Sequence, residues 1–336
     1  MFCIRSNTES DTRQAKDYNF GISSLPWVSG RDVSGVVEQV GSDVSGFLPG
    51  DPVFTLTDYS SSRCGAFQEY SIARVSSVGQ IPRCLSFEEA AAVPVAAITA
   101  AVGLKRYMKI GSIHDDPKKQ GQAQWFLVWG GATNTGYFTI QLAKLYGYRV
   151  IAVCSSHNFD YVREAGAEVV IDRKDSHASL TSQIRQITAG NLRYAFDAVG
   201  STSATSCLRC LESQEPSNER RLLVALAGFP AEVKKAGKLN GVYKLSDGSQ
   251  VEVPEIKVKV FHNEPDFGDQ ILKEITAYFE LGKLKVPRLV IVHGGLQAVN
   301  QGLMRLKRGN ISGYKLVIQI EHTSDRPGHL EYNGWL

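Results

Sequence analysis

The chain of 336 residues has few cysteines and no marked excess of charge of either sign. Its six cysteines are spread along the sequence, and a chain of this length buries its core without disulfides, so we expect a reducing, cytoplasmic environment. The 37 basic and 34 acidic residues nearly cancel, and no basic run is typical of a nucleic-acid-binding surface. No stretch reaches the roughly 18 consecutive apolar residues of a membrane helix. We therefore expect a globular protein that binds neither nucleic acid nor membrane.

Motifs for metal binding and for hydrolysis are lacking as well. Zinc needs three or four converging ligands, and the seven histidines form no H-E-x-x-H set. The one Cys-x-x-Cys pair, Cys207 and Cys210, falls on an expected helix without a second pair, which indicates core or surface cysteines. No G-x-S-x-G elbow marks a serine hydrolase. The sequence thus predicts no metal site.

Two patterns of secondary structure follow one another along the chain. Residues 25–73 alternate short β-branched strands with turns, and residues 86–104 predict two helices separated by Pro94. From residue 125 a strand–loop–helix rhythm repeats, with strands expected near residues 125–129, 149–154, 168–171, 194–199 and 221–227. Such alternation predicts an α/β fold with a doubly wound parallel sheet. Residues 230–250 show no clear period, and we interpret them as a surface excursion.

A loop rich in glycine and threonine follows the apolar strand at residues 125–129 and opens a helix. Compared with the dinucleotide motif G-x-G-x-x-G, Gly131 and Gly136 fill the first and third places and Thr133 replaces the middle glycine. The first glycine permits a tight turn, the third permits close packing, and the Thr133 hydroxyl could donate to a phosphate oxygen. The alternative is a plain turn in an empty sheet, but the strand–loop–helix context favours dinucleotide binding. The predicted cofactor-binding residues here are Gly131, Ala132, Thr133, Asn134, Thr135 and Gly136.

The end of the second strand of this series bears on which dinucleotide binds. NAD sites place a carboxylate there for the ribose hydroxyl, whereas a 2′-phosphate needs donors or cations. This chain has Ser155, Ser156 and His157, with no acid, and Arg173 follows the next strand. NADPH is therefore favoured over NADH. The alternative is that the two serines only cap the next helix.

Three further residues are expected near the nicotinamide. Asp197 and Gly200 follow the strand near residue 194, and Gly228 follows the next strand. Ligands of open α/β sheets bind outside the carboxyl ends of the strands, so these residues are predicted to line the site. Each glycine has the alternative of a simple turn residue.

Several segments together resemble the medium-chain dehydrogenase/reductase superfamily, in its zinc-free quinone and enoyl reductase branch. The segments that carry this resemblance are residues 25–37, 40–42, 49–54, 65–70, 90–104, the glycine loop and residues 313–317. Residues 154–160 and 191–197 are similar to the trans-acting enoyl reductases of fungal polyketide synthases, including the lovastatin type. The resemblance covers residues 25–320.

The resemblance implies a Rossmann domain at residues 96–265 and a GroES-like substrate domain at residues 1–95, to which residues 266–336 return. Relatives usually have further residues before Phe2, so an N-terminally shortened substrate domain is expected. Arg31 stands where zinc-dependent members have a histidine ligand, which implies the zinc-free branch. The resemblance also places Thr99 near the nicotinamide carboxamide, Lys315 at the cofactor, and Ser155, Ser156, His157 and Arg173 near the 2′-phosphate.

The expected activity is NADPH-dependent reduction of an activated carbon–carbon double bond in an enoyl thioester or enone, in fungal secondary metabolism. The expected partners are a small-molecule or carrier-bound acyl substrate and a polyketide synthase. The alternatives are a quinone oxidoreductase, an alcohol dehydrogenase-like enzyme, and a truncated NADPH-binding paralogue without turnover. No catalytic residue is assigned; Tyr18, Tyr59 and Tyr314 are candidate proton donors only because a tyrosine hydroxyl can protonate an enolate.

Overall fold

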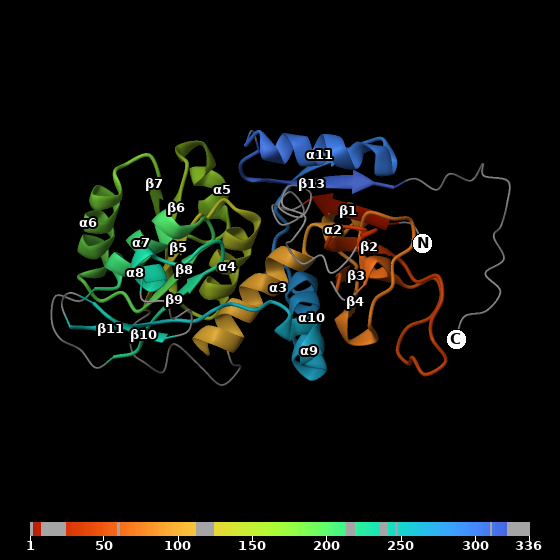
Figure 1. Ribbon diagram of the computed structural model, residues 1–336, viewed down its shortest axis with the longest axis horizontal. Coiled ribbons are helices and arrows are strands. Elements are labelled where there is room, and N and C mark those ends of the chain that lie inside the picture. Colours follow the sequence, from red (N-terminus) through yellow and green to blue (C-terminus); the bar gives the residue numbers. More distant parts are fainter. Residues whose placement is uncertain are drawn as a thin grey trace.

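The strands form two sheets, one in each of two lobes (Figure 1). The structure, a computed structural model, describes residues 3–7, 25–58, 61–111, 124–212, 219–235, 241–245, 248–309 and 311–320. Helix α3 (Pro94–Val102) lies between the lobes, packed on α4 (Asn134–Leu145) of one and on β2 (Asp32–Val36) and β3 (Pro52–Leu56) of the other. The region between the lobes is where the candidate site is found.

The first sheet is six-stranded and takes strands from both parts of the chain. Its order is β12-β13-β1-β2-β3-β4, with β1 at Cys3–Asn7, β4 at Val78–Gln80, β12 at Arg288–Val292 and β13 at Tyr314–Gln319. Strand β1 pairs antiparallel with both β2 and β13. The sheet joins early and late segments into the predicted GroES-like, β-rich domain.

The second sheet is seven-stranded, in the order β10-β11-β9-β8-β5-β6-β7. Its strands are β5 Trp125–Trp129, β6 Arg149–Cys154, β7 Val169–Asp172, β8 Tyr194–Asp197, β9 Arg221–Ala225, β10 Gly241–Lys244 and β11 Gln250–Val253. All neighbours are parallel except β10 and β11. Chain order reverses direction on either side of β5, which creates the crevice where ligands of doubly wound sheets bind. The predicted Rossmann fold is confirmed.

Local sequence signals account for the helices at the lobe boundary. Helix α2 (Phe87–Ala91) begins at a capping box in which the Ser86 side chain accepts from Glu89 N and Glu89 reaches back to Ser86 N. Pro94 opens α3 at its first position, where a missing N–H costs nothing. The remaining helices are α5 Phe159–Glu164, α6 His177–Thr188, α7 Ser201–Cys210, α8 Ala231–Lys235, α9 Val260–Asn263, α10 Pro265–Glu280 and α11 Ala298–Lys307, and η3 (Gly103–Met108) is a π-helix.

The structure decides two expectations about the α/β lobe. The segment at residues 230–250 is not a mere surface excursion, because it supplies α8, β10 and the start of β11, which extend the sheet. In β11 every second residue is buried, and Val251 and Val253 are the two buried ones. The alternation is too short to stand out in the sequence beside the neighbouring turn-type residues. Cys207 and Cys210 are buried core residues of α7, which decides between the core and surface positions that the sequence left open.

The two sheets draw on different parts of the chain. All strands of the second sheet fall between residues 125 and 253. We propose 1–95, 96–265 and 266–336 as the domain boundaries. Within the described residues, no helix has the length and apolar character needed to cross a bilayer.

Candidate active site

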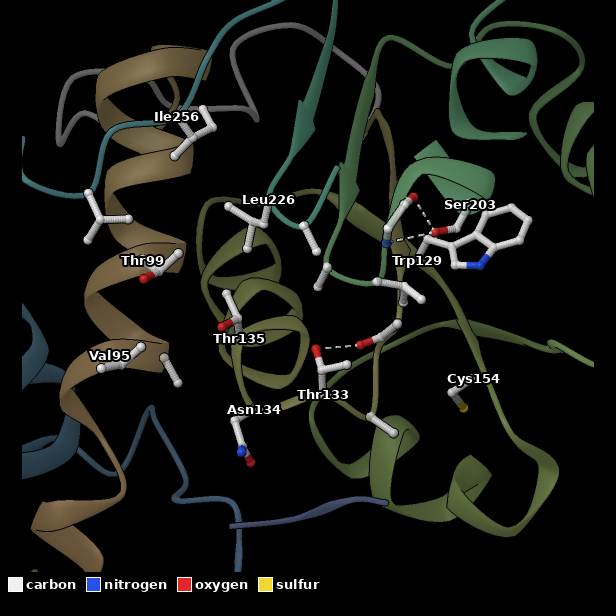
Figure 2. Close-up of a pocket in the computed structure, with 18 of the residues that line it drawn as sticks. Val95, Thr99, Trp129, Thr133, Asn134, Thr135, Cys154, Ser203, Leu226 and Ile256 are labelled. Carbon is white, nitrogen blue, oxygen red and sulfur yellow. Dashed lines mark hydrogen bonds between the residues drawn. The ribbon is translucent and has the colours of Figure 1, made fainter. Parts of the chain in front are cut away.

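A cavity of about 1660 Å³ runs along the carboxyl ends of β5, β6, β8 and β9, with α3 on its opposite side. Figure 2 shows Val95 and Thr99 on α3 facing Leu226 and Thr135 across this space, with Asn134 at one end of the labelled set and Ile256 at the other. Ten of the predicted site residues line it: Thr99, Ala132, Thr133, Asn134, Thr135, Ser155, Arg173, Gly200, Lys315 and the candidate donor Tyr314. Gly131, Gly136, Ser156, His157, Asp197 and Gly228 are not among the lining residues.

The roles of the glycines in the loop differ in part from those expected. The left-handed turn belongs to Gly130, with φ of 85°, and not to Gly131. A Cβ on Gly131 would come within 3.0 Å of Ala152 Cβ, so Gly131 serves packing against β6. A Cβ on Gly136 would collide with the Gly130 carbonyl, which is the close approach expected of the third glycine.

Thr133 is the N-cap of α4. Its hydroxyl accepts from Gly136 N at 3.0 Å and donates to the Gly130 carbonyl at 2.8 Å. The single hydroxyl proton is therefore engaged within the loop, which corrects the expectation that Thr133 donates to a phosphate. Free N–H groups in the first turn of α4 remain available to bind an anion.

An unsatisfied polar atom lies beside this helix end. Asn134 Oδ1 is buried without a hydrogen-bond partner, and Asn134 lines the cavity. A buried polar group without a partner is costly, so it calls for one supplied from the cavity. The ribose hydroxyls of a dinucleotide are donors of that kind, and the residues present fit such a ligand.

At the end of β6, Arg173 Nε donates to Ser155 Oγ at 2.6 Å, and Arg173 N donates to the Cys154 carbonyl at 2.8 Å. Neither Ser155 nor Ser156 caps a helix through its side chain, which disfavours the capping alternative. Ser156 and His157 are exposed at the surface nearby. Burial raises the pKa of the adjacent Cys154 thiol to about 12, so this cavity residue stays protonated.

Asp197 organises the turn after β8 rather than lining the cavity. Its Oδ1 accepts from Val199 N at 3.0 Å and from Gly200 N at 2.9 Å, while Oδ2 is buried without a hydrogen-bond partner. Burial raises the pKa of Asp197 to about 6, against the opposing effect of its hydrogen bonds. Gly200 has open space around its Cβ position, whereas a Cβ on Gly228 would collide with Ser201 Oγ. Gly200 thus leaves open space at the cavity, whereas Gly228 is required for packing.

Beneath the cavity, Lys315 Nζ lies 2.7 Å from Asp32 Oδ2, and Val95 N donates to Asp32 Oδ1 at 2.5 Å. Asp32 and Lys315 are both fully buried. The Lys315 ammonium therefore serves an internal ion pair, and a contact of Lys315 with the cofactor stays a prediction. Arg31, next to Asp32, lines the cavity.

Some lining residues carried no signal that the sequence interpretation used. Trp129 closes β5 and stacks on His177, with ring centroids 5.6 Å apart and planes 9° apart. Its place at the carboxyl end of a central strand could have identified it. Val95, Leu226 and Ile256 add apolar surface to the cavity, and nothing local distinguishes them from core residues.

Across the described ranges, no group of three or more His, Cys, Asp or Glu side chains converges as a metal site would require. Tyr314 lies on the cavity and is 43% exposed. Tyr18 and Tyr59, the other candidate proton donors, lie outside the described residues.

Comparison with known proteins identifies the family. Residues 5–99 match the alcohol dehydrogenase GroES-like domain, and residues 135–215 match the zinc-binding dehydrogenase family. The chain is 32% identical over 323 residues to the enoyl reductase component lovC of the lovastatin nonaketide synthase of Aspergillus terreus, covering 93% of this chain and 86% of that protein. It is 31% identical to a trans-enoyl reductase of Gibberella fujikuroi, covering 88% and 83%. A mycobacterial protein solved with NADPH superposes with a TM-score of 0.75 at 20% identity, covering 95% of this chain and 90% of that chain, which shows the shared fold.

The chain belongs to the medium-chain dehydrogenase/reductase superfamily, also called the zinc-type alcohol dehydrogenase superfamily. More particularly, it is an oxidoreductase related to the fungal trans-enoyl reductases. Members of this superfamily use NAD(P)H.

Proposed function

We propose that this protein is an NADPH-dependent, zinc-independent reductase of an activated carbon–carbon double bond. The substrate class is an enoyl thioester or enone, and the setting is trans-acting enoyl reduction beside a fungal polyketide synthase. The observation that carries the choice of cofactor is the Arg173–Ser155 pair at the acid-free end of β6, facing the cavity. The similarity to trans-enoyl reductases supports the choice of reaction.

The chain's own residues would hold the cofactor at three places. The N-terminal turn of α4, with Ala132, Asn134 and Thr135, would bind the pyrophosphate, and Gly131, Thr133 and Gly136 shape that turn. Arg173 and Ser155, with Ser156 and His157 at the surface, would bind the 2′-phosphate. Thr99 and Gly200 would flank the nicotinamide, while Asp197 and Gly228 support the turns there.

When bound, NADPH supplies hydride for the β-carbon of the alkene, and a proton added at the α-carbon completes the reduction. Val95, Leu226 and Ile256 keep that region apolar, which strengthens polar contacts to the developing enolate. Tyr314 lines the cavity and stays a candidate proton donor for the second step.

The test is to follow NADPH oxidation with crotonyl thioesters, enones and quinones, and to locate deuterium transferred from NADPD. We expect deuterium at the β-carbon of the saturated thioester. Replacement Thr99→Ala should lower kcat/KM about tenfold, while Thr99→Ser, which keeps the hydroxyl, should retain activity. Absence of substrate-dependent NADPH loss with every acceptor would refute the proposed reduction.

The same preparation separates the alternatives. Stoichiometric zinc by metal analysis, with alcohol oxidation, would favour an alcohol dehydrogenase. Turnover of quinones but not of enoyl thioesters would favour a quinone oxidoreductase. Tight NADPH binding by calorimetry without any turnover would favour a paralogue that only binds NADPH.

A further inference from the structure

The cavity extends beyond the place proposed for the nicotinamide, to the end that is remote from the glycine loop. Exposed side chains form a mouth of the cavity there. Figure 2 shows Ile256 at this end, opposite Asn134. The mouth is formed by two segments: the end of η3, with Arg106, Tyr107 and Lys109, and residues 256–264. A dinucleotide that runs from Arg173 to Thr99 leaves this end of the cavity for another ligand.

The charge of this mouth is positive. Lys109, Lys257 and Lys259 all line the cavity and are exposed. Arg106 is neutralised by Glu264, with 2.8 Å between the charged atoms. Lys257 Nζ is farther from its partner, at 3.4 Å from Glu255 Oε2, and forms a weak surface pair. Neither Lys109 nor Lys259 has an ion-pair partner among the residues that the structure describes. Among the described residues, the mouth therefore carries excess positive charge.

The two segments are fastened to each other, so the lysines have a common framework. Tyr107 Oη accepts from Lys257 N at 2.8 Å, and Arg220 donates to the Tyr107 and Met108 carbonyls at 3.4 and 3.3 Å. Lys109 has a left-handed backbone, with φ of 60°, where η3 ends. Beside the lysines, Ile256, Val258 and Val260 are half-buried on the cavity side and supply apolar surface.

We propose that this mouth, through Lys109, Lys257 and Lys259, binds the phosphate of a phosphopantetheine arm whose thioester reaches the nicotinamide along Ile256, Val258 and Val260. The inference rests on the proposed function, which makes the substrate a thioester. An anionic phosphate gains charge-assisted hydrogen bonds from ammonium groups, and a flexible arm passes over the apolar side chains. Coenzyme A and a carrier domain both present this arm, so the phosphate is the feature they share.

The experiment compares two substrates that differ only in the phosphate: crotonyl-phosphopantetheine and crotonyl-pantetheine. The double variant Lys257→Glu/Lys259→Glu should lower kcat/KM about tenfold for the phosphorylated substrate and leave the other within about twofold. The matched control Lys273→Glu/Lys283→Glu has the same charge change on exposed lysines outside the cavity and should affect neither. Lys109→Glu should act in the same direction as the first double variant. Equal effects on both substrates, or none, would overturn the proposal.

Calorimetry gives a second measurement that does not require turnover. Phosphopantetheine should bind the NADPH-loaded protein about tenfold more tightly than pantetheine, and Lys257→Glu/Lys259→Glu should abolish the difference. If no enoyl substrate consumes NADPH, the proposed function fails but this binding comparison still decides the inference. No preference for the phosphorylated compound would overturn it.

The source of the arm is tested with crotonyl-coenzyme A and with a crotonyl-loaded carrier domain. A loss with both in the lysine variants supports recognition of the shared phosphate. A loss with the carrier domain alone would mean that the lysines contact the carrier's protein surface, which would overturn the assignment to the phosphate.

Discussion

Lys315 Nζ lies 2.7 Å from Asp32 Oδ2, and the two side chains are separated by 283 residues in sequence. The ion pair joins β13, near the end of the described chain, to β2, and Asp32 also accepts from Val95 N at the start of α3. Because Val95 and Lys315 both line the cavity, the pair sets the floor of the site. A charge pair enclosed in this way cannot lose one member cheaply.

Replacement Asp32→Asn is therefore expected to destabilise the fold by about 3–5 kcal/mol, because it leaves the Lys315 ammonium buried without its counter-charge. The measurement is the free energy of unfolding from urea titration. The double variant Asp32→Asn/Lys315→Met, which removes both charges, should recover much of the loss. A single variant as stable as the wild type would show that the pair contributes nothing.

Replacement Arg173→Ala is expected to weaken NADPH binding about tenfold and to leave NADH binding nearly unchanged, because only the 2′-phosphate would contact the guanidinium. Calorimetry gives the dissociation constants of both cofactors, and the ratio of the NADPH constant to the NADH constant is compared between the variant and the wild type. Lys174→Ala is the matched control, since Lys174 is adjacent and exposed but does not line the cavity. An equal loss for NADH would place Arg173 outside the phosphate site.

Sequence reasoning predicted the fold well because strand–helix alternation and the glycine loop are local patterns. It misplaced the left-handed turn by one residue, since Gly130 and Gly131 are adjacent glycines and only the backbone reveals which has positive φ. It missed β10 and β11, because each of these strands has only four residues and residue types typical of turns flank them in the sequence. It did not foresee the Asp32–Lys315 pair, because a contact over 283 residues leaves no periodic trace.

The Asp197 carboxyl should make stability depend on pH in a defined direction. Burial raises its pKa to about 6, so between pH 6 and 4 the folded chain holds a proton that the unfolded chain lacks. Its contribution therefore favours folding as pH falls. The free energy of unfolding of Asp197→Asn, taken relative to that of the wild type, should fall by about 2 kcal/mol from pH 7.5 to pH 4.5. Urea unfolding at each pH would measure this difference.

The exposed Asp43→Asn is the control for this comparison, and its difference from the wild type should not change with pH in that way. A pH-independent difference between Asp197→Asn and the wild type would contradict the raised pKa.

His262 should act on stability with the opposite sign. Its Nδ1 lies 2.9 Å from Ser77 Oγ and its Nε2 is buried without a hydrogen-bond partner. Burial, with the nearby charges of Arg31 and Arg74 and against the charge of Asp58, lowers its pKa to about 4. Between pH 6.5 and 4 the unfolded chain binds a proton that the folded chain does not, so this contribution is present above pH 6.5 and is lost as pH falls.

Replacement His262→Gln removes the titrating group at some cost in packing. Relative to the wild type, the variant should gain about 2 kcal/mol in the free energy of unfolding between pH 7 and pH 4.5, whatever its offset at neutral pH. His293→Gln, at an exposed position, is the matched control and should show no such gain. Because Asp197 works in the other direction over the same range, the wild-type profile alone would show only their difference, and the two single variants are needed to separate them. If His262→Gln and the wild type lose stability in parallel, His262 is already protonated in the folded protein.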